Sequence, residues 1–237
     1  QLIVGGAFTS AGGAPAFRIA SWNGTDWSSF DVGMNHEVRA LGEFNGELIA
    51  GGVFTQAGVN SASFIAGWDG ATWNPLGSGL GSAVFALAIY NNELIAAGQF
   101  SIAEGNPADR IARWNGTVWE TLGTGMNNQI QSLAVYNGEL IAGGAFIEAG
   151  GVPAQKLARW DGLAWDSFHF AAPSSTVSSL IVHNGDLYIG GAFTSLNGNP
   201  APGIARWDGD DWQTLAAGLG ATVSTMAIYG DELIAGG

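Results

Sequence analysis

The sequence predicts an all-β protein built from tandem repeats, and three observations carry this prediction. Glycine makes up 38 of the 237 residues. Because helix interiors tolerate glycine poorly, this excess disfavours a helical protein and indicates many turns. The ten tryptophans fall into pairs that recur every 46 or 47 residues. An apolar motif of the form L-I-[AV]-G-G returns at the same period, which is typical of a repeat architecture.

The repeat accounts for the whole chain, so a single domain over residues 1–237 is expected. The members of each tryptophan pair are five residues apart: Trp22/Trp27, Trp68/Trp73, Trp114/Trp119, Trp160/Trp165 and Trp207/Trp212. The apolar motif, or a close variant, begins at Leu2, Leu48, Leu94, Leu140, Leu187 and Leu233. With 47% hydrophobic residues the chain has ample material for a core, which excludes a disordered protein.

Each repeat is predicted to form four strands. The first strand is apolar and covers 38–44, 84–90, 130–136, 177–183 and 223–229. Two residues that accept positive φ follow it, such as Asn45-Gly46, as a tight hairpin requires. The L-I-A-G-G motif forms the second strand. A loop of about ten residues then leads to the third strand, for instance 110–114, and an Asn-Gly or Asp-Gly turn leads to the fourth.

The polarity of these strands favours a five-bladed β-propeller with four antiparallel strands per blade. The first two strands are almost continuously apolar, as expected for strands buried on both faces between neighbouring blades. The fourth strand is polar, for example 210–214, and is therefore placed at the outer rim. Four hairpin-connected strands repeated five times correspond to the blades of a propeller.

The second strand occurs once too often. Residues 1–6 and 232–237 are both copies of it, while the other strands occur five times. We expect the ring to close by pairing of the N- and C-terminal strands, which removes exposed sheet edges. One copy then fills the shared position, and the other is displaced or exchanges onto a second chain. The alternative is that the chain is a segment of a longer tandem array.

The repeat resembles the kelch-like propeller family over all five repeats. The likeness rests on a Gly-Gly pair that ends an apolar strand, followed by an aromatic residue shortly before a Trp, as in Gly51-Gly52 with Trp68 and Trp73. The first aromatic residue is Trp rather than the usual Tyr, and Ala97-Gly98 replaces one glycine pair. The blade number and repeat length are similar to those of tachylectin-type lectins. Repeats of this style also resemble those of large secreted bacterial proteins, which implies an extracellular protein.

The charge balance excludes several classes of partner. Seven basic against twenty acidic residues give a net charge of −13. Phosphate recognition needs a basic face, so no nucleic-acid partner is expected, and an anionic membrane surface is equally disfavoured. No apolar run is long enough to span a bilayer. The chain has no cysteine, so thiol catalysis and cysteine-ligated metals are excluded.

The polar residues give little support for catalysis. The three histidines fall at different phases of the repeat, so neither a catalytic triad nor a metal trio is expected: His36, His169 and His183. The acidic residues after the first turn recur in every repeat and form a ring that attracts cations or simply flanks the turns: Glu47, Glu93, Glu139, Asp186 and Glu232. We expect neither a metal nor a cofactor.

Two recurring sets allow alternative interpretations. The tryptophan pairs suit either sugar stacking or packing between blades, and packing explains their presence in every repeat better. Arg113, Arg159 and Arg206 precede the first tryptophan of three pairs. Each forms either a cation–π contact or an ion pair with a nearby carboxylate.

The long loops are the place where binding is expected, because loops on a rigid scaffold usually carry function. The loops between repeats present apolar residues at equivalent positions, which predicts an apolar collar and a ligand-binding set: Met34, Leu80, Met126, Phe170 and Leu219. The loop around Phe170 is irregular and holds one extra residue, so it is the first place to look for a unique site. A local acidic cluster, Asp208, Asp210 and Asp211, lacks the pattern of a calcium loop.

These observations predict a non-catalytic protein that is a scaffold or a binding module for a protein or a carbohydrate. A repeat with no evolved ligand fits the same pattern. The alternative is a multivalent carbohydrate-binding lectin with up to five equivalent sites, in which avidity replaces tight single-site binding. An enzyme is not expected.

Overall fold

The structure is a computed structural model that describes residues 1–169, 171–215 and 218–237. It divides into two compact units, Gln1–Leu122 and Gly123–Gly237. Both units consist of β-strands and turns, as the glycine content predicts. In the described residues no helix is long and apolar enough to cross a membrane.

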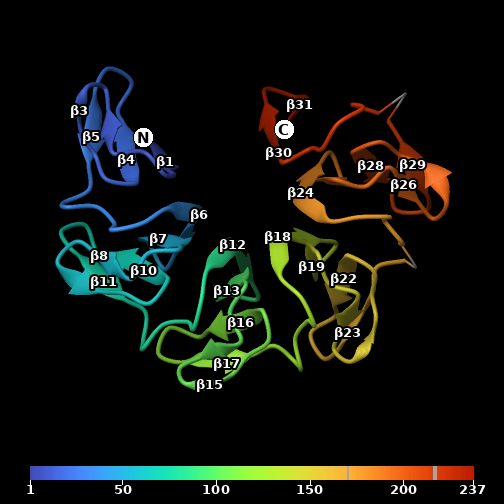
Figure 1. Cartoon of the computed structure of the whole chain (residues 1–237), viewed down its shortest axis with the longest axis horizontal. Coiled ribbons are helices and arrows are strands. Elements are labelled where there is room, and N and C mark those ends of the chain that lie inside the picture. The colour runs from blue at the N-terminus through green and yellow to red at the C-terminus, as the bar shows by residue number, and fades with distance from the viewer. Residues whose placement is uncertain (170, 216–217) are drawn as a thin grey trace. The chain divides into compact units, whose positions relative to one another are not determined.

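The first unit contains three antiparallel sheets (Figure 1). The first of them has three strands: β1 (Leu2–Gly5), β4 (Ile19–Trp22) and β5 (Trp27–Ser29). The second has four strands: β6 (Val38–Phe44), β7 (Glu47–Gly52), β10 (Ile65–Trp68) and β11 (Trp73–Pro75). The third repeats this order: β12 (Val84–Tyr90), β13 (Glu93–Gly98), β16 (Ile111–Trp114) and β17 (Trp119–Thr121).

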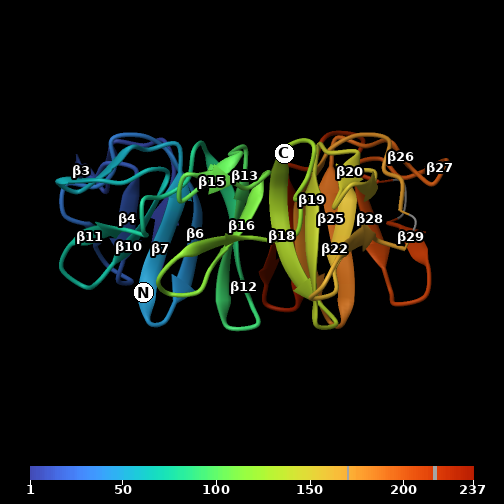
Figure 2. The same ribbon diagram turned by 90° about the horizontal axis from the view of Figure 1, so that it is seen from below.

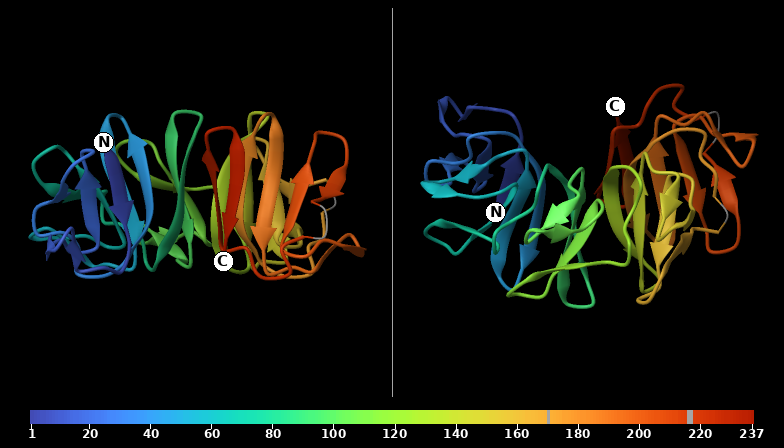
Figure 3. Two further views of the ribbon diagram at one scale, coloured as in Figure 1. Left: turned by 90° about the horizontal axis from the view of Figure 1, so that it is seen from above. Right: turned by 60° about the horizontal axis from the view of Figure 1, so that its bottom comes forward.

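The second unit contains two complete sheets and a hairpin. One sheet consists of β18 (Ile130–Tyr136), β19 (Glu139–Gly144), β22 (Leu157–Trp160) and β23 (Trp165–Ser167). The other consists of β24 (Val177–His183), β25 (Asp186–Gly191), β28 (Ile204–Trp207) and β29 (Trp212–Thr214). The hairpin is β30 (Thr225–Tyr229) and β31 (Glu232–Gly236), and Figure 3 shows it in red beside β24.

The predicted strands are therefore confirmed in order and nearly in length. The first strand of the second to fifth tryptophan repeats matches the prediction at both ends in β6, β12, β18 and β24, whereas the last one, β30, begins at Thr225 rather than at residue 223. Both residues of the turn after β6, Asn45 and Gly46, have positive φ, 52° and 83°. The turn between β30 and β31 differs, because it has Gly230 as its first residue, with φ 63°.

The loops between the second and third strands hold more structure than the sequence predicts. Each contains a small hairpin of two-residue strands, and in the second unit the β26–β27 hairpin lies at the end of the sheet away from the β24–β25 turn (Figure 2). Such short strands have no apolar periodicity to reveal them. The hairpins are β2–β3 (Ser10–Ala11, Ala14–Pro15), β8–β9 (Gln56–Ala57, Asn60–Ser61), β14–β15 (Ile102–Ala103, Asn106–Pro107), β20–β21 (Glu148–Ala149, Val152–Pro153) and β26–β27 (Ser195–Leu196, Asn199–Pro200).

Neighbouring sheets approach one another closely at two of the glycines in the second strand. A Cβ added to Gly143 would lie 2.7 Å from Cγ1 of Val177 in the next sheet. The same approach recurs between Gly51 and Val84, at 2.6 Å. Contacts this short exclude a side chain, because protein interiors are close-packed. The Gly-Gly motif is therefore explained by close contact between sheets as well as by turn geometry.

The terminal strands pair locally. In the described residues β1 is hydrogen-bonded only to β4 within its sheet, and β30 only to β31. No sheet there joins the N-terminal strand to the C-terminal one. The predicted closure of the ring, and with it the count of five blades, stays a prediction.

Candidate functional site

The apolar residues expected to bind a ligand are mostly buried. Met34, Leu80 and Met126 are at most 3% exposed, and each forms a β-bridge to an alanine of a small hairpin: Ala57, Ala103 and Ala149. These three side chains pack beneath the loops and have almost no exposed surface. Leu219 is 55% exposed, and Phe170 lies outside the described residues. A binding role for this set stays a prediction.

The recurring acidic residues are largely neutralised by the recurring arginines. Arg159 lies 2.7 Å from Glu139, and Arg113 lies 2.8 Å from Glu120. Of the two interpretations offered for these arginines, the structure shows the ion pairs. Further pairs are Arg113–Glu93 at 3.3 Å, Arg206–Asp186 at 3.3 Å, Arg159–Asp166 at 3.7 Å and Arg206–Asp208 at 3.9 Å. Three of the five acidic residues in the predicted ring therefore already face a guanidinium. Within the described ranges, no group of three or more acidic, histidine or cysteine side chains is placed to hold a metal ion.

The tryptophan pairs belong to the packing between sheets. Trp114 and Trp119 are cross-strand partners with ring centroids 5.3 Å apart, and both are buried. Nε1 of Trp119 donates a buried hydrogen bond of 2.9 Å to the carbonyl of Leu76, which follows the fourth strand of the preceding sheet. Phe168 occupies the equivalent position two repeats after Leu76. Its ring meets that of Trp207 edge-on, with centroids 5.8 Å apart. Packing rather than ligand stacking thus explains most of these indoles.

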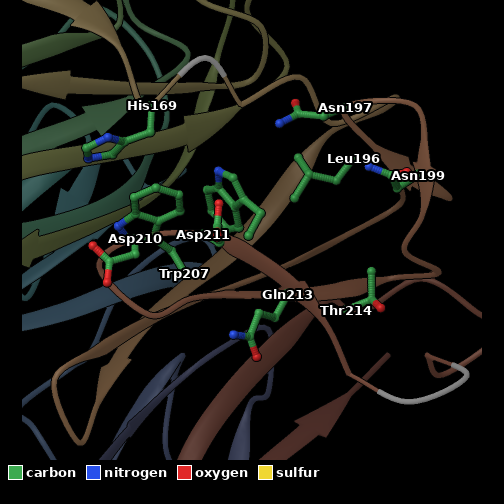
Figure 4. Close-up of a pocket in the computed structure, with 10 residues that line it drawn as sticks. His169, Leu196, Asn197, Asn199, Trp207, Asp210, Asp211, Gln213 and Thr214 are labelled. Carbon is green, nitrogen blue, oxygen red and sulfur yellow. The ribbon is translucent and has the colours of Figure 1, made fainter.

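One pocket combines aromatic faces with several polar groups, and it lies in the second unit (Figure 4). It encloses about 310 Å³ between the irregular loop after β23, the β26–β27 hairpin and the β28–β29 turn. His169 and Asp210 lie on one side, and Leu196 and Asn197 lie on the other. The lining residues are His169, Leu196, Asn197, Asn199, Trp207, Asp210, Asp211, Trp212, Gln213 and Thr214.

The irregular loop places an imidazole on an indole. The ring of His169 stacks on Trp207 with centroids 4.3 Å apart and an interplanar angle of 19°. Burial, followed by the nearby positive charge of Arg159, lowers the pKa of His169. The imidazole is therefore largely neutral at pH 7 and adds an aromatic wall rather than a charge. Asn197 fixes the loop by accepting a 2.7 Å hydrogen bond from the backbone N–H of Ala172.

The acidic turn supplies carboxylates with different roles. Oδ1 of Asp208 accepts backbone hydrogen bonds from Asp210 at 3.0 Å and Asp211 at 2.9 Å, which lower its pKa. Its Oδ2 accepts a hydrogen bond from the amide of Gln213. Asp208 thus shapes the turn. In the described part of the chain, no hydrogen bond or ion pair engages the carboxylates of Asp210 and Asp211, and both line the pocket.

A counterpart of this pocket occurs in the first unit with a different lining. It lies at the equivalent place beside β14–β15 and β17 and encloses about 380 Å³. Its lining residues are Ala103, Asn106, Arg113, Trp119, Glu120 and Thr121. The guanidinium of Arg113 lies in it, whereas histidine and aspartate are not among its lining residues. The site between β26 and β29 is therefore chemically distinct.

Sequence reasoning found this site only in part. The sequence signals are the irregular loop and the acidic cluster, and His169 of that loop and Asp210 and Asp211 of that cluster line the pocket. The amides of Asn197, Asn199 and Gln213 were missed, because a single Asn or Gln in a turn is usually explained by turn geometry. The stacking role of His169 had no sequence signal beyond its position beside the irregular loop.

The comparisons with known proteins show the fold. The family model described as "Domain of unknown function (DUF5122) beta-propeller" matches residues 184–210, which run from the turn before β25 into the acidic turn after β28. No curated protein matches the chain.

Two solved structures are similar over nearly the whole chain. The crystal structure of the computationally designed Ika8 protein has a TM-score of 0.56 at 17% identity, and the match covers 92% of this chain and 61% of that one. The WD40 beta propeller domain of Doa1 has a TM-score of 0.55 at 16% identity, with 99% and 70% covered. The chain thus spans about three fifths of the length of the designed protein. Together with the repeated four-strand sheets, these matches show that the chain is built from β-propeller repeats.

Proposed function

We propose that the protein is a non-catalytic binding module, or a rigid scaffold, whose ligand occupies the pocket lined by His169, Trp207 and Asp211. One observation carries the proposal: only here do the described repeats combine an aromatic stack with carboxylates that lack a partner. Elsewhere in the described residues, the recurring arginines form ion pairs and the Trp114/Trp119 pair packs between sheets. The family match and the structural neighbours support a propeller fold, and the binding role is argued from the pocket itself.

A non-catalytic role fits the state of the polar groups in the pocket. In the described residues no hydrogen bond orients a ring nitrogen of His169, and Asp208 is occupied by the backbone N–H groups of its own turn. A catalytic base is usually held in place by a third group within hydrogen-bond reach. The free carboxylates of Asp210 and Asp211 suit binding through hydrogen bonds or charge.

A carbohydrate ligand is the second candidate. Indole and imidazole faces suit the apolar faces of sugars, and Asn197, Asn199 and Gln213 offer donors and acceptors for hydroxyl groups. The counterpart pocket beside Arg113 has a different lining, so two sites of unequal affinity fit better than five equivalent ones. A carbohydrate ligand agrees with the similarity in repeat length to tachylectin-type lectins. We also propose that the repeats are kelch-like and that the protein is extracellular.

The larger architecture is also a proposal. Five tryptophan repeats correspond to five blades, and the incomplete terminal sheets complete one blade between them. Among the residues that the structure describes, the three-stranded sheet β1–β4–β5 has no first strand, whereas the hairpin β30–β31 consists of a first and a second strand. Pairing of the N- and C-terminal strands closes the ring.

Binding arrays test the functional proposal. The full chain is applied to a glycan array and to a peptide array, and hits are measured by calorimetry. The double variant Asp210→Asn/Asp211→Asn should lose most of the affinity, whereas Glu120→Gln in the counterpart pocket should not. Equal loss with both variants, or binding that neither changes, would place the ligand elsewhere. Saturation with several sugars per chain supports a lectin, whereas hits on peptides alone support a protein-binding module.

A further inference from the structure

The pocket of the second unit and its counterpart in the first unit are built from the same positions of the repeat. In each unit a short hairpin and the fourth strand of a sheet supply the walls. What differs between the two linings is their charge, and this difference indicates which ligand chemistry the pocket of the second unit accepts. The corresponding wall residues are Ala103 and Leu196, Asn106 and Asn199, Trp119 and Trp212, and Thr121 and Thr214.

The counterpart pocket already contains a guanidinium group, which belongs to the chain itself. Arg113 lines this pocket, and its Nη2 donates a 2.8 Å hydrogen bond to Oε2 of Glu120 on the fourth strand. Nη1 of Arg113 donates at 3.3 Å to Glu93. The amide of Asn115 donates to the other carboxylate oxygen of Glu120, also at 3.3 Å. A carboxylate on the fourth strand thus holds a cation in a pocket of this shape.

The pocket of the second unit has lost this internal cation. Gln213 stands where the counterpart has its carboxylate, and the side-chain amide of Gln213 donates to Oδ2 of Asp208. The arginine of this repeat position, Arg206, is not among the lining residues. Its guanidinium pairs with Asp186 at 3.3 Å and with Asp208 at 3.9 Å. No lysine or arginine lines this pocket.

The turn after β28 brings two carboxylates to the same pocket. Asp210 and Asp211 both line it, and in the described part of the chain neither carboxylate takes part in a hydrogen bond or an ion pair. Among the five repeats only this one has two acidic residues at these turn positions. The pocket therefore has two unpaired negative charges where its counterpart has a paired cation. The equivalent pairs in the other repeats are Thr25-Asp26, Ala71-Thr72, Thr117-Val118 and Leu163-Ala164.

We propose that this pocket binds the guanidinium group of an arginine side chain on a peptide or protein partner, with Asp210 and Asp211 as its anionic partners. The inference rests on the proposed binding function of the pocket and names its ligand. A guanidinium presents several N–H donors in one plane, pairs with carboxylates and stacks on aromatic rings. The net charge of −13 also attracts cationic partners to the chain.

The aromatic walls suit the same ligand. The ring of Trp212 is half-buried and lies 5.5 Å from that of Trp207, on which His169 stacks. Burial, and then the positive charge of Arg159, lowers the pKa of His169, so its ring adds no positive charge at pH 7 that would repel a cation. The pocket thus offers both the aromatic faces and the carboxylates that a guanidinium prefers.

A titration followed by histidine NMR tests the proposal in the full chain, because the chain has only three histidines. Nα-acetylarginine amide is the probe, and Nα-acetylcitrulline amide is its uncharged counterpart of similar shape. We expect the arginine probe to shift the signals of His169 and to leave those of His36 and His183 unchanged. Because the citrulline probe carries no charge, it should bind about tenfold more weakly or worse, and added salt should weaken the arginine probe.

Two variants and a control assign the charge. Asp210→Asn/Asp211→Asn should weaken the arginine probe about tenfold. Asp210→Thr/Asp211→Val installs the turn sequence of the third repeat, which forms the same turn, and should weaken it at least as much. Asp26→Asn, in the equivalent turn of the first repeat, should leave the affinity unchanged. Circular dichroism checks that each variant is folded.

The outcomes separate this ligand from the binding function of the pocket. Equal affinity for the arginine and citrulline probes, or full affinity in the Asp210→Asn/Asp211→Asn variant, would overturn the proposal. Equal affinity for Nα-acetyllysine amide would overturn the choice of a guanidinium. A shift confined to His183 would place the probe elsewhere and overturn the site. Glycan binding that the same double variant abolishes, with no response to arginine, would keep the pocket as the binding site and overturn the arginine ligand.

Discussion

The surroundings of Phe168 and of Phe30 differ although the repeat gives them equivalent neighbours. Around Phe168, the first strand of its own sheet covers the junction with the next sheet. The neighbouring residues Ile141, Leu187 and Trp207 are buried there. Around Phe30, the equivalent residues Ile3, Leu48 and Trp68 are only half-buried, and in the described residues no first strand pairs with the sheet β1–β4–β5. An apolar residue at these positions is therefore buried by the first strand of its own sheet as well as by the neighbouring sheet.

The largest effect should come from removing the aromatic residue at this junction. Phe168→Ala leaves a cavity against Tyr136, Trp207 and Trp212, so we expect the free energy of unfolding to fall by about 3–5 kcal/mol. Urea denaturation measures this. Phe30→Ala should approach the same loss if a first strand completes the sheet β1–β4–β5, as proposed. A loss below about 1 kcal/mol for Phe30→Ala would mean that the two regions remain different in solution.

A smaller loss should follow from filling the glycine contacts between sheets. Gly143→Ala pushes a methyl group against Val177, and we expect a loss of about 1–3 kcal/mol in unfolding free energy. The double variant Gly143→Ala/Val177→Ala should recover part of it. Gly5→Ala meets Val38 in the same way and should cost as much. A neutral Gly5→Ala would show that β1 is less firmly held than the other second strands.

The indole hydrogen bonds give a finer comparison between two sheets. Nε1 of Trp119 donates to the Leu76 carbonyl, whereas the buried Nε1 of Trp73 has no partner in the described structure. Replacement by Phe removes similar volume at both positions. Trp119→Phe should therefore lower the unfolding free energy by about 1 kcal/mol more than Trp73→Phe does, measured by urea denaturation. An equal effect at both positions would contradict a role for the bond.

The smallest effect concerns the turn between the third and fourth strands, which begins with asparagine in two repeats and with aspartate in three. The backbone N–H groups of Thr72 and Ala71 lower the pKa of Asp69 to about 2. A lowered carboxyl pKa stabilises the fold above the unfolded value near 4, and this contribution is lost as the pH falls through about 2. Asn115 makes equivalent backbone bonds without titrating. Asp69→Asn should therefore flatten the pH dependence of stability between pH 4 and 2, and an unchanged profile would contradict this.

The strand order could be predicted because each strand carries its own local signal. The apolar run of β18, the Asn137-Gly138 turn and the Gly-Gly end of β19 are each readable without knowledge of neighbours. The spacing of the tryptophan pairs predicts the length of the repeat. In the structure, packing between sheets explains why the pair occurs in every repeat. The two-residue strands such as β14 and β15 were missed, because they are too short to show a period.

The site was harder to predict because burial depends on residues far apart in sequence. Met34 and Met126 look like a surface set in the sequence, yet each is covered by a hairpin that follows the next sheet's second strand. The pocket at His169 joins a loop, a hairpin and a turn from two repeats. Only the irregularity of the loop and the acidic turn signalled it.

Amide hydrogen exchange of the two equivalent second strands tests the central claim most directly. β7 is hydrogen-bonded on both edges, to β6 and β10, whereas β1 is bonded along its length only to β4 in the described structure. If β30 completes the blade, the amides of residues 2–5 should be protected about as strongly as those of residues 48–51. Rapid exchange of alternate amides in β1, with β7 protected, would show an open edge and contradict the account.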